Sequence, residues 1–169
     1  MFKHILFSIW RYLLPITVVI LILLVLVHLL GIVAGDPFLV TLSGQFLMVY
    51  GLGLILPYTL HEYFHAKLLL WFKVAIKIEQ TVWRVSIIPV TQLSALPAIL
   101  VALAGPLGVA LIGLLLRAVT LTIHGIKLNF LAYFYLSHLM FLLPFFGDGQ
   151  VVLINLLNYF RRSLNGNRN

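Results

Sequence analysis

The chain has no cysteine among its 169 residues. This absence excludes disulfide bonds, iron–sulfur clusters and thiolate zinc sites. Acidic residues are also scarce, with only four Asp and Glu in total. Any metal ion in this protein must therefore be held by His, Asp or Glu side chains drawn from a small set.

Charge of either sign is rare. Charged residues make up 9% of the sequence, whereas a soluble domain has about 25%. Hydrophobic residues make up 63%, and the net charge is +7. The basic residues are scattered among apolar runs instead of forming one stripe, so we expect a lipid bilayer as partner and no nucleic acid.

The apolar runs are long enough for membrane helices, which need roughly 20 residues. We predict one integral membrane domain over residues 1–169, all-α, with four spans and a polar tail at 161–169. The spans are residues 13–33, 39–70, 96–116, and a last one that starts near Phe130, breaks around Pro144 and resumes to Phe160. Between the second and third spans, "KVAIKIEQTVWRVSIIPV" (73–90) predicts a short β-hairpin turning near Glu79 to Thr81.

The distribution of Lys and Arg predicts the orientation. If the N-terminus is cytoplasmic, nine of the 11 basic residues lie inside and only Arg117 and Lys127 lie outside. The inside residues are Lys3, Arg11, Lys67, Lys73, Lys77, Arg84, Arg161, Arg162 and Arg168. This positive-inside bias requires an even number of spans, so we expect both termini in the cytoplasm.

The segment "HEYFH" at 61–65 contains the candidate metal ligands and general base. On a helix, His61 and His65 project from one face about a turn apart, so both can bind one zinc ion. Glu62 lies on the adjacent face, where the HExxH pattern places a general base. A structural histidine pair is the alternative, but a carboxylate near the hydrocarbon is costly and indicates function.

A catalytic zinc needs a third protein ligand. The candidates are His28, His138, Asp36, Glu79 and Asp148. Asp148 is about 19 residues into the last span and His61 about 22 into the second, so at 1.5 Å per residue both reach a similar depth. Pro144 and the glycines around Asp148 would break the helix there, so Asp148 is the predicted third ligand.

These motifs resemble those of the site-2 protease family of intramembrane zinc metalloproteases. The similar segments are "HEYFH" (61–65), "LAGPLG" (103–108) and "LLPFFGDGQ" (142–150), within residues 45–160. The resemblance implies a three-helix protease core plus an extra N-terminal helix. It also implies one zinc on His61, His65 and Asp148, with Glu62 as catalytic acid and base.

The resemblance further implies that Gly105 and Pro106 lie beside the site and that the hairpin receives substrate in extended form. We include Gly105, Pro106 and His138 as candidate substrate-binding residues. The family's third motif has an Asn before its proline, but Met140 and Phe141 fill that region here, so Ser137 or His138 is a candidate replacement.

The expected function is hydrolysis of transmembrane or membrane-tethered proteins near the cytoplasmic side, with Glu62 taking a proton from the attacking water. Two alternatives come from other classes. One is an inactive homologue that binds membrane helices as a scaffold. The other is an ion or metal transporter, although such proteins often contain internal repeats and none is found here.

Overall fold

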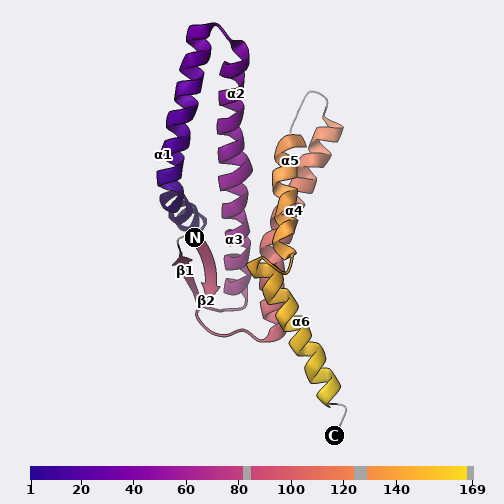
Figure 1. The fold of residues 1–169 in the computed structure, drawn as a ribbon. Helices are drawn as coiled ribbons and strands as arrows, with labels where there is room; N and C mark the ends of the chain where they lie inside the picture. The colour runs from indigo at the N-terminus through magenta and orange to yellow at the C-terminus, as the bar shows by residue number, and fades with distance from the viewer. Residues whose placement is uncertain (82–84, 124–128, 167–169) are drawn as a thin grey trace. The chain divides into compact units, whose positions relative to one another are not determined.

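The computed structural model describes residues 1–81, 85–123 and 129–166 (Figure 1). Within these residues, four helical segments are long and apolar enough to cross a membrane, and one two-stranded hairpin accompanies them. The spans are Phe2–Ala34, Pro37–Trp71, Ala95–Thr122 and Asn129–Arg161. The predicted fold class is thereby confirmed. Arg84, Lys127 and Arg168 lie outside the described residues.

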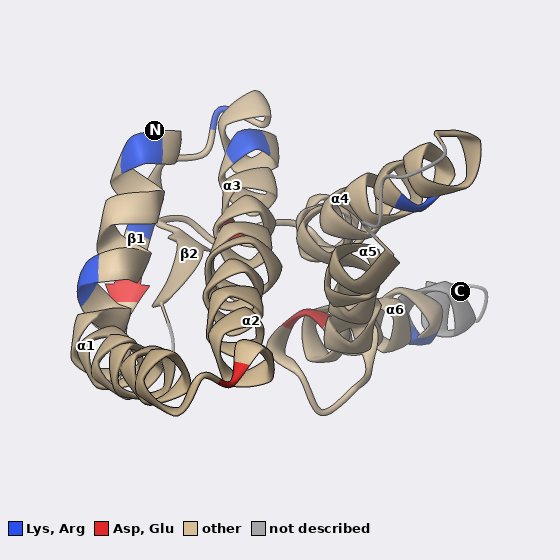
Figure 2. Cartoon of the chain, turned by 90° about the horizontal axis from the view of Figure 1, so that it is seen from above, with Lys and Arg blue, Asp and Glu red and all other residues tan. Residues whose placement is uncertain are grey.

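Charged residues interrupt these helices only sparsely. In Figure 2 the long helices are mostly tan, with short coloured segments for Lys, Arg, Asp and Glu. The chain divides into two compact units, Met1–Thr59 and Leu60–Asn169.

The first unit is a helical hairpin. Helix α1 (Phe2–Ala34) begins well before the predicted Leu13, and α2 (Pro37–Met48) continues into a π-helical segment, η1 (Val49–Ile55). The turn between α1 and α2 uses Gly35 in the left-handed region, with φ 64°. Asp36 then caps α2, because its side chain accepts a hydrogen bond from Phe38 N at 2.8 Å.

Two side-chain hydrogen bonds join α1 to the returning chain. Tyr50 donates its hydroxyl to Thr17 Oγ1 at 2.6 Å, because the Thr17 hydroxyl already donates to the Leu13 carbonyl. His28 Nδ1 lies 2.8 Å from Ser43 Oγ. Such polar contacts between apolar helices stabilise their pairing in a membrane.

The second unit contains most of α3 (Leu56–Trp71) and everything after it. Its remaining elements are β1 (Ile76–Gln80), β2 (Val85–Pro89), α4 (Ala95–Thr122), α5 (Asn129–Leu136), the 3-10 helix η2 (Ser137–Leu142) and α6 (Gly147–Gly166). Helix α4 packs against α5, η2 and α6 (Figure 1). Gly113 permits the close approach of α4 to α5, since a Cβ there would lie 2.9 Å from Tyr135 Cβ.

The hairpin forms where the β-branched, alternating sequence predicts it. β1 and β2 pair antiparallel, with Ile78 opposite Ile87 and Gln80 opposite Val85. Because Glu79 and Gln80 are paired residues of β1, the predicted turn beginning at Glu79 is wrong, and the connection lies after Gln80. The β propensity of this segment identified the strands. It does not say which residue of one strand pairs with which residue of the other, so it could not locate the turn.

The last span is broken, as its proline and glycines predict. α5 passes directly into η2, which ends at Leu142, and α6 starts at Gly147. Pro144 lies in the break, where the missing N–H and fixed φ of proline prevent helix continuation. The break places Asp148 in the first turn of α6.

Candidate metal centre

The two histidines of HEYFH lie on one face of α3, as their spacing predicts. Their Nε2 atoms are 3.0 Å apart, and the rings meet edge to face. Both side chains are buried, with 4% and 7% of their surface exposed for His61 and His65. Two nitrogens this close inside the protein need a proton or a cation between them, because their lone pairs repel.

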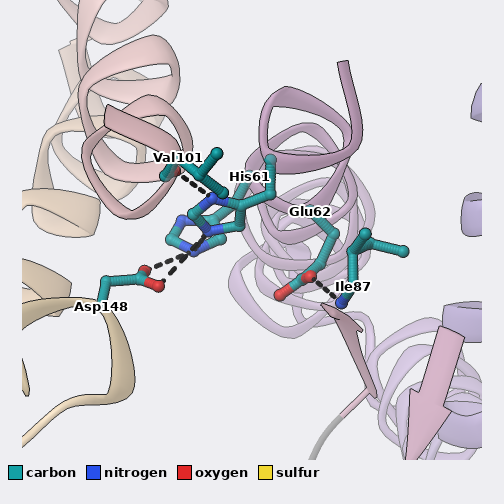
Figure 3. Close-up of polar contacts among 6 residues, drawn as sticks. His61, Glu62, Ile87, Val101 and Asp148 are labelled. Carbon is teal, nitrogen blue, oxygen red and sulfur yellow. Dashed lines mark hydrogen bonds and ion pairs between the residues drawn. The ribbon is translucent and has the colours of Figure 1, made fainter. Parts of the chain in front are cut away.

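Asp148 completes the cluster from α6. One carboxylate oxygen lies 2.9 Å from His61 Nε2, and the other lies 3.4 Å from His65 Nε2 (Figure 3). The turn at the start of α6 is tight around Gly149, where an added Cβ would collide with the carbonyl oxygens of Leu142 and Leu143. The predicted convergence of Asp148 with both imidazoles is therefore present in the structure.

The spacing of these donors fits a small tetrahedral cation. Ligand atoms at zinc bond lengths of about 2.0–2.2 Å in a tetrahedron lie about 3.3–3.6 Å apart. The two Nε2 atoms are 3.0 Å apart, and two different oxygens of Asp148 lie 2.9 Å from His61 Nε2 and 3.4 Å from His65 Nε2, all near this spacing. Two imidazoles and one carboxylate also form a donor set that zinc takes in catalytic sites. Among the described residues, these three form the group that could hold a metal ion.

The orientation of His65 is fixed by the backbone of α4. Its Nδ1 lies 2.6 Å from the Val101 carbonyl oxygen, so Nδ1 carries the proton and the lone pair of the neutral ring is at Nε2 (Figure 3). A partner of this kind on the second ring nitrogen is characteristic of metal-binding histidines. His61 Nδ1 is buried and has no such partner within the described chain.

Gly105 makes the approach of His65 to Val101 possible. It lies one turn after Val101 on α4, and an added Cβ would lie 2.6 Å from His65 Cε1 and 3.0 Å from His61 Cδ2. The helix backbone therefore packs directly against both imidazole rings. Pro106, the next residue, is fully buried in α4. Gly105 therefore lies against the cluster, and the role of both residues in substrate binding stays a prediction.

Glu62, the residue after His61, is hydrogen-bonded to the hairpin. Its Oε2 accepts a hydrogen bond from the Ile87 N–H of β2 at 2.7 Å, and only 6% of the residue is exposed. Figure 3 shows one carboxylate oxygen of Glu62 directed toward Ile87 of β2, whereas Asp148 approaches the imidazoles from the other side. The residue predicted as general base thus accepts a hydrogen bond from a strand amide.

His138 flanks the cluster without joining its donor atoms. Its ring centroid lies 5.5 Å from that of His61, and its Nδ1–H donates to the Phe134 carbonyl at 3.1 Å. Ser137 also donates to Phe134, at 2.7 Å. The other candidates for a third ligand lie elsewhere: His28 contacts Ser43, Asp36 caps α2 and Glu79 is in β1.

Sequence reasoning missed the two backbone groups at the site, the Val101 carbonyl and the Ile87 amide. Every residue carries such groups, so residue type gives no signal for them. Gly105 was the one indirect indication, because a glycine inside a helix suggests close approach of another group.

Comparisons with known proteins identify no relative. No protein-family model, curated protein or solved structure matches this chain. Any functional assignment therefore depends on the chemistry of the site.

Proposed function

We propose that this chain is an intramembrane zinc metalloprotease of the site-2 protease type. One observation carries the proposal: two imidazole nitrogens and a carboxylate meet within 3.4 Å of one another, inside apolar helices and next to Glu62. A charged group at such depth is costly unless it is paired and used. The donor set and its spacing favour zinc, at one ion per chain.

Each residue has a role in peptide hydrolysis. A zinc ion bound here would supply a Lewis acid for the peptide carbonyl and acidify the neighbouring water. Glu62 accepts the proton of the attacking water and delivers it to the amine nitrogen as the peptide C–N bond breaks. His65 keeps its Nε2 lone pair available because Nδ1 is bound to Val101.

The proposed substrates are transmembrane or membrane-tethered proteins, cut near the cytoplasmic side. The excess of basic residues in the predicted inside segments supports cytoplasmic termini, and the HExxH segment is near the inner end of its span. The break around Pro144 next to Asp148 is a feature that would admit water, because irregular backbone at membrane depth is tolerated where it lines water or protein.

The experiment compares wild type with Glu62→Gln, both purified in detergent. The probe is fluorescein-labelled casein, an unfolded protein without a membrane requirement. We expect the wild type to cleave casein and Glu62→Gln to be at least about a hundredfold slower, with the zinc content unchanged. A chelator should abolish wild-type cleavage.

Equal cleavage by Glu62→Gln would contradict the proposal. Cleavage by neither protein, with zinc bound to both, would also count against it and favour a scaffold. A change in metal flux into vesicles caused by Glu62→Gln would instead indicate a transporter.

A further inference from the structure

His138 is a buried imidazole next to the metal centre, and the proposed reaction does not use it. We propose that His138 is a positioning residue, whose Nε2 accepts a hydrogen bond from Nδ1 of His61 when His61 Nε2 binds a cation. The inference rests on the metal centre of the proposed function, and it adds a partner for the second ring nitrogen of His61.

The contacts within the cluster determine where His61 carries its proton. His65 Nδ1 donates to the Val101 carbonyl at 2.6 Å, so the lone pair of His65 is on Nε2. His61 Nε2 lies 3.0 Å from this lone pair and 2.9 Å from a carboxylate oxygen of Asp148 (Figure 3). Both neighbours are acceptors, so in this arrangement the neutral His61 ring has its proton on Nε2 and its lone pair on Nδ1.

Cation binding requires the opposite tautomer of His61. A metal ion binds an imidazole nitrogen through its lone pair, so the proton of the neutral ring must then be on Nδ1. His61 Nδ1 is buried and has no hydrogen-bond partner within the described residues. A buried N–H without an acceptor loses its hydration and gains nothing in return. His61 therefore needs an acceptor on this nitrogen, as His65 has in the Val101 carbonyl.

His138 has a lone pair suited to this role. Its Nδ1–H donates to the Phe134 carbonyl at 3.1 Å, so the lone pair of the neutral ring is on Nε2. The ring centroids of His61 and His138 are 5.5 Å apart, with the planes tilted by 50°. Two imidazoles joined by an N–H···N hydrogen bond of about 3 Å have centroids about 5 Å apart, because each nitrogen lies about 1.1 Å from its ring centre. A small movement of the two rings is therefore enough to form the bond.

Phe141 also packs on both imidazoles, and it is the weaker acceptor. Its ring centroid lies 5.0 Å from that of His61 and 5.3 Å from that of His138. A phenyl ring has no lone pair, and an N–H···π contact is weaker than a hydrogen bond to nitrogen. His138 Nε2 is therefore the stronger acceptor of the two rings that pack on His61 from η2.

The broken last span thus provides groups for both nitrogens of His61. Asp148, in the first turn of α6, contacts Nε2, and His138, in η2, is the proposed partner of Nδ1. The 3-10 helix ends at Leu142 and α6 starts at Gly147, so one short connection holds both groups. We infer that it fixes the orientation of the His61 ring as the Val101 carbonyl fixes that of His65.

Nitrogen NMR of the wild type in detergent tests the tautomer and the hydrogen bond directly. Protein labelled with ¹⁵N-histidine is compared after treatment with a chelator and after addition of one equivalent of zinc. We expect the His61 proton on Nε2 in the chelator-treated protein and on Nδ1 in the zinc-loaded protein. A ¹⁵N–¹⁵N coupling between His61 Nδ1 and His138 Nε2, transmitted through the hydrogen bond, should appear only with zinc.

Three variants separate the hydrogen bond from packing. His138→Gln retains an acceptor oxygen near the position of Nε2, whereas His138→Phe retains a ring without an acceptor. Ser137→Ala is the matched control, because this exposed neighbour also donates to Phe134. Zinc affinity is measured by competition with a chromophoric chelator. We expect His138→Phe to bind zinc about 10-fold more weakly than the wild type, and His138→Gln and Ser137→Ala to stay close to it.

Several results would overturn the inference. They are unchanged zinc affinity in His138→Phe, equal weakening in His138→Phe and His138→Gln, no coupling in the zinc-loaded wild type, or no zinc binding by the wild type. None of these measurements uses catalysis. If the wild type shows the coupling but does not cleave casein, the protease proposal fails and the role of His138 remains. If it cleaves casein without the coupling, only the role of His138 fails.

Discussion

Position 105 controls how closely α4 can approach the two metal-binding candidates on α3. The absence of a side chain there lets His65 reach the Val101 carbonyl at 2.6 Å. That hydrogen bond fixes which ring nitrogen holds the lone pair. A residue without any functional group therefore determines the ligand geometry.

We predict that Gly105→Ala weakens zinc binding about 10- to 100-fold, the range seen when the support of a ligand is disturbed. The added methyl group would press on both imidazole rings. The measurement is zinc affinity by competition with a chromophoric chelator. Gly44→Ala is the matched control, because a Cβ at Gly44 meets nothing within 4 Å. Unchanged affinity in Gly105→Ala would show that the rings do not depend on this contact.

Sequence reasoning works for side chains with a characteristic spacing. The separation of His61 and His65 placed both rings on one helix face, and equal depth along two spans matched Asp148 to them. It did not reveal that Glu62 bonds to Ile87, because that contact depends on where the hairpin packs. Tertiary contacts to backbone atoms cannot be predicted from the pattern of residue types, because every residue has the same backbone groups.

Among the elements, the broken last span is the one on which Asp148 depends. α6 begins with Gly147, Asp148 and Gly149, and Gly149 lies directly against the carbonyls of Leu142 and Leu143. Since a side chain at 149 would collide with backbone, the turn cannot be relieved by a rotamer change. The position of the carboxylate is therefore set by the geometry of this connection.

Gly149→Ala should accordingly displace the start of α6 and reduce the zinc content of the purified protein several-fold. The helical content, measured by circular dichroism, should stay near that of the wild type because the change is local. Gly51→Ala is the control, since a Cβ at Gly51 has open space. Full zinc occupancy in Gly149→Ala would mean that Asp148 is not positioned by this turn.

The helical hairpin of the first unit permits a separate stability prediction. Tyr50→Phe removes the hydroxyl that binds Thr17, while Thr17 still donates to Leu13. No buried donor is left unpaired, so the free energy of unfolding should fall by about 0.6 kcal/mol, which is typical of a hydrogen bond between membrane helices. Unfolding in mixed micelles measures it. Tyr133→Phe serves as control, and an equal loss in both variants would contradict the prediction.

The elements were predictable to different degrees. Apolar length gave the four spans and β-branched alternation gave the hairpin, since each reflects a regular repeat. The π-helical segment at Val49–Ile55 and the 3-10 helix at Ser137–Leu142 were not predicted. Such variants differ from an α-helix only in which carbonyl each N–H reaches, and packing decides that.

For the whole molecule, charge and hydrophobicity determine how the chain relates to a bilayer. The apolar composition gave the membrane class directly. The division into two units near Thr59 had no counterpart in the sequence, because the helix α3 runs through it without interruption. The boundary between the two units is set by contacts between segments that are distant in the sequence, and the residue pattern does not show these contacts.

We predict that both termini lie in the cytoplasm, because nine of the 11 basic residues fall in the segments that this orientation places inside. Reporter fusions measure this orientation. A fluorescent protein that folds only in the cytoplasm should be active at either end, and alkaline phosphatase, which needs export, should be active when fused in the loop near Asp36 and inactive at either terminus. Activity of alkaline phosphatase at either terminus would contradict the orientation.

The central claim is that His61, His65 and Asp148 jointly hold one cation. The most direct measurement is the metal content of the protein purified in detergent without chelator. Wild type should carry about one zinc per chain, Asp148→Ala should carry much less, and Asp36→Ala, which removes an acid outside the cluster, should match the wild type. Full zinc content in Asp148→Ala, or no bound metal in the wild type, would contradict the account.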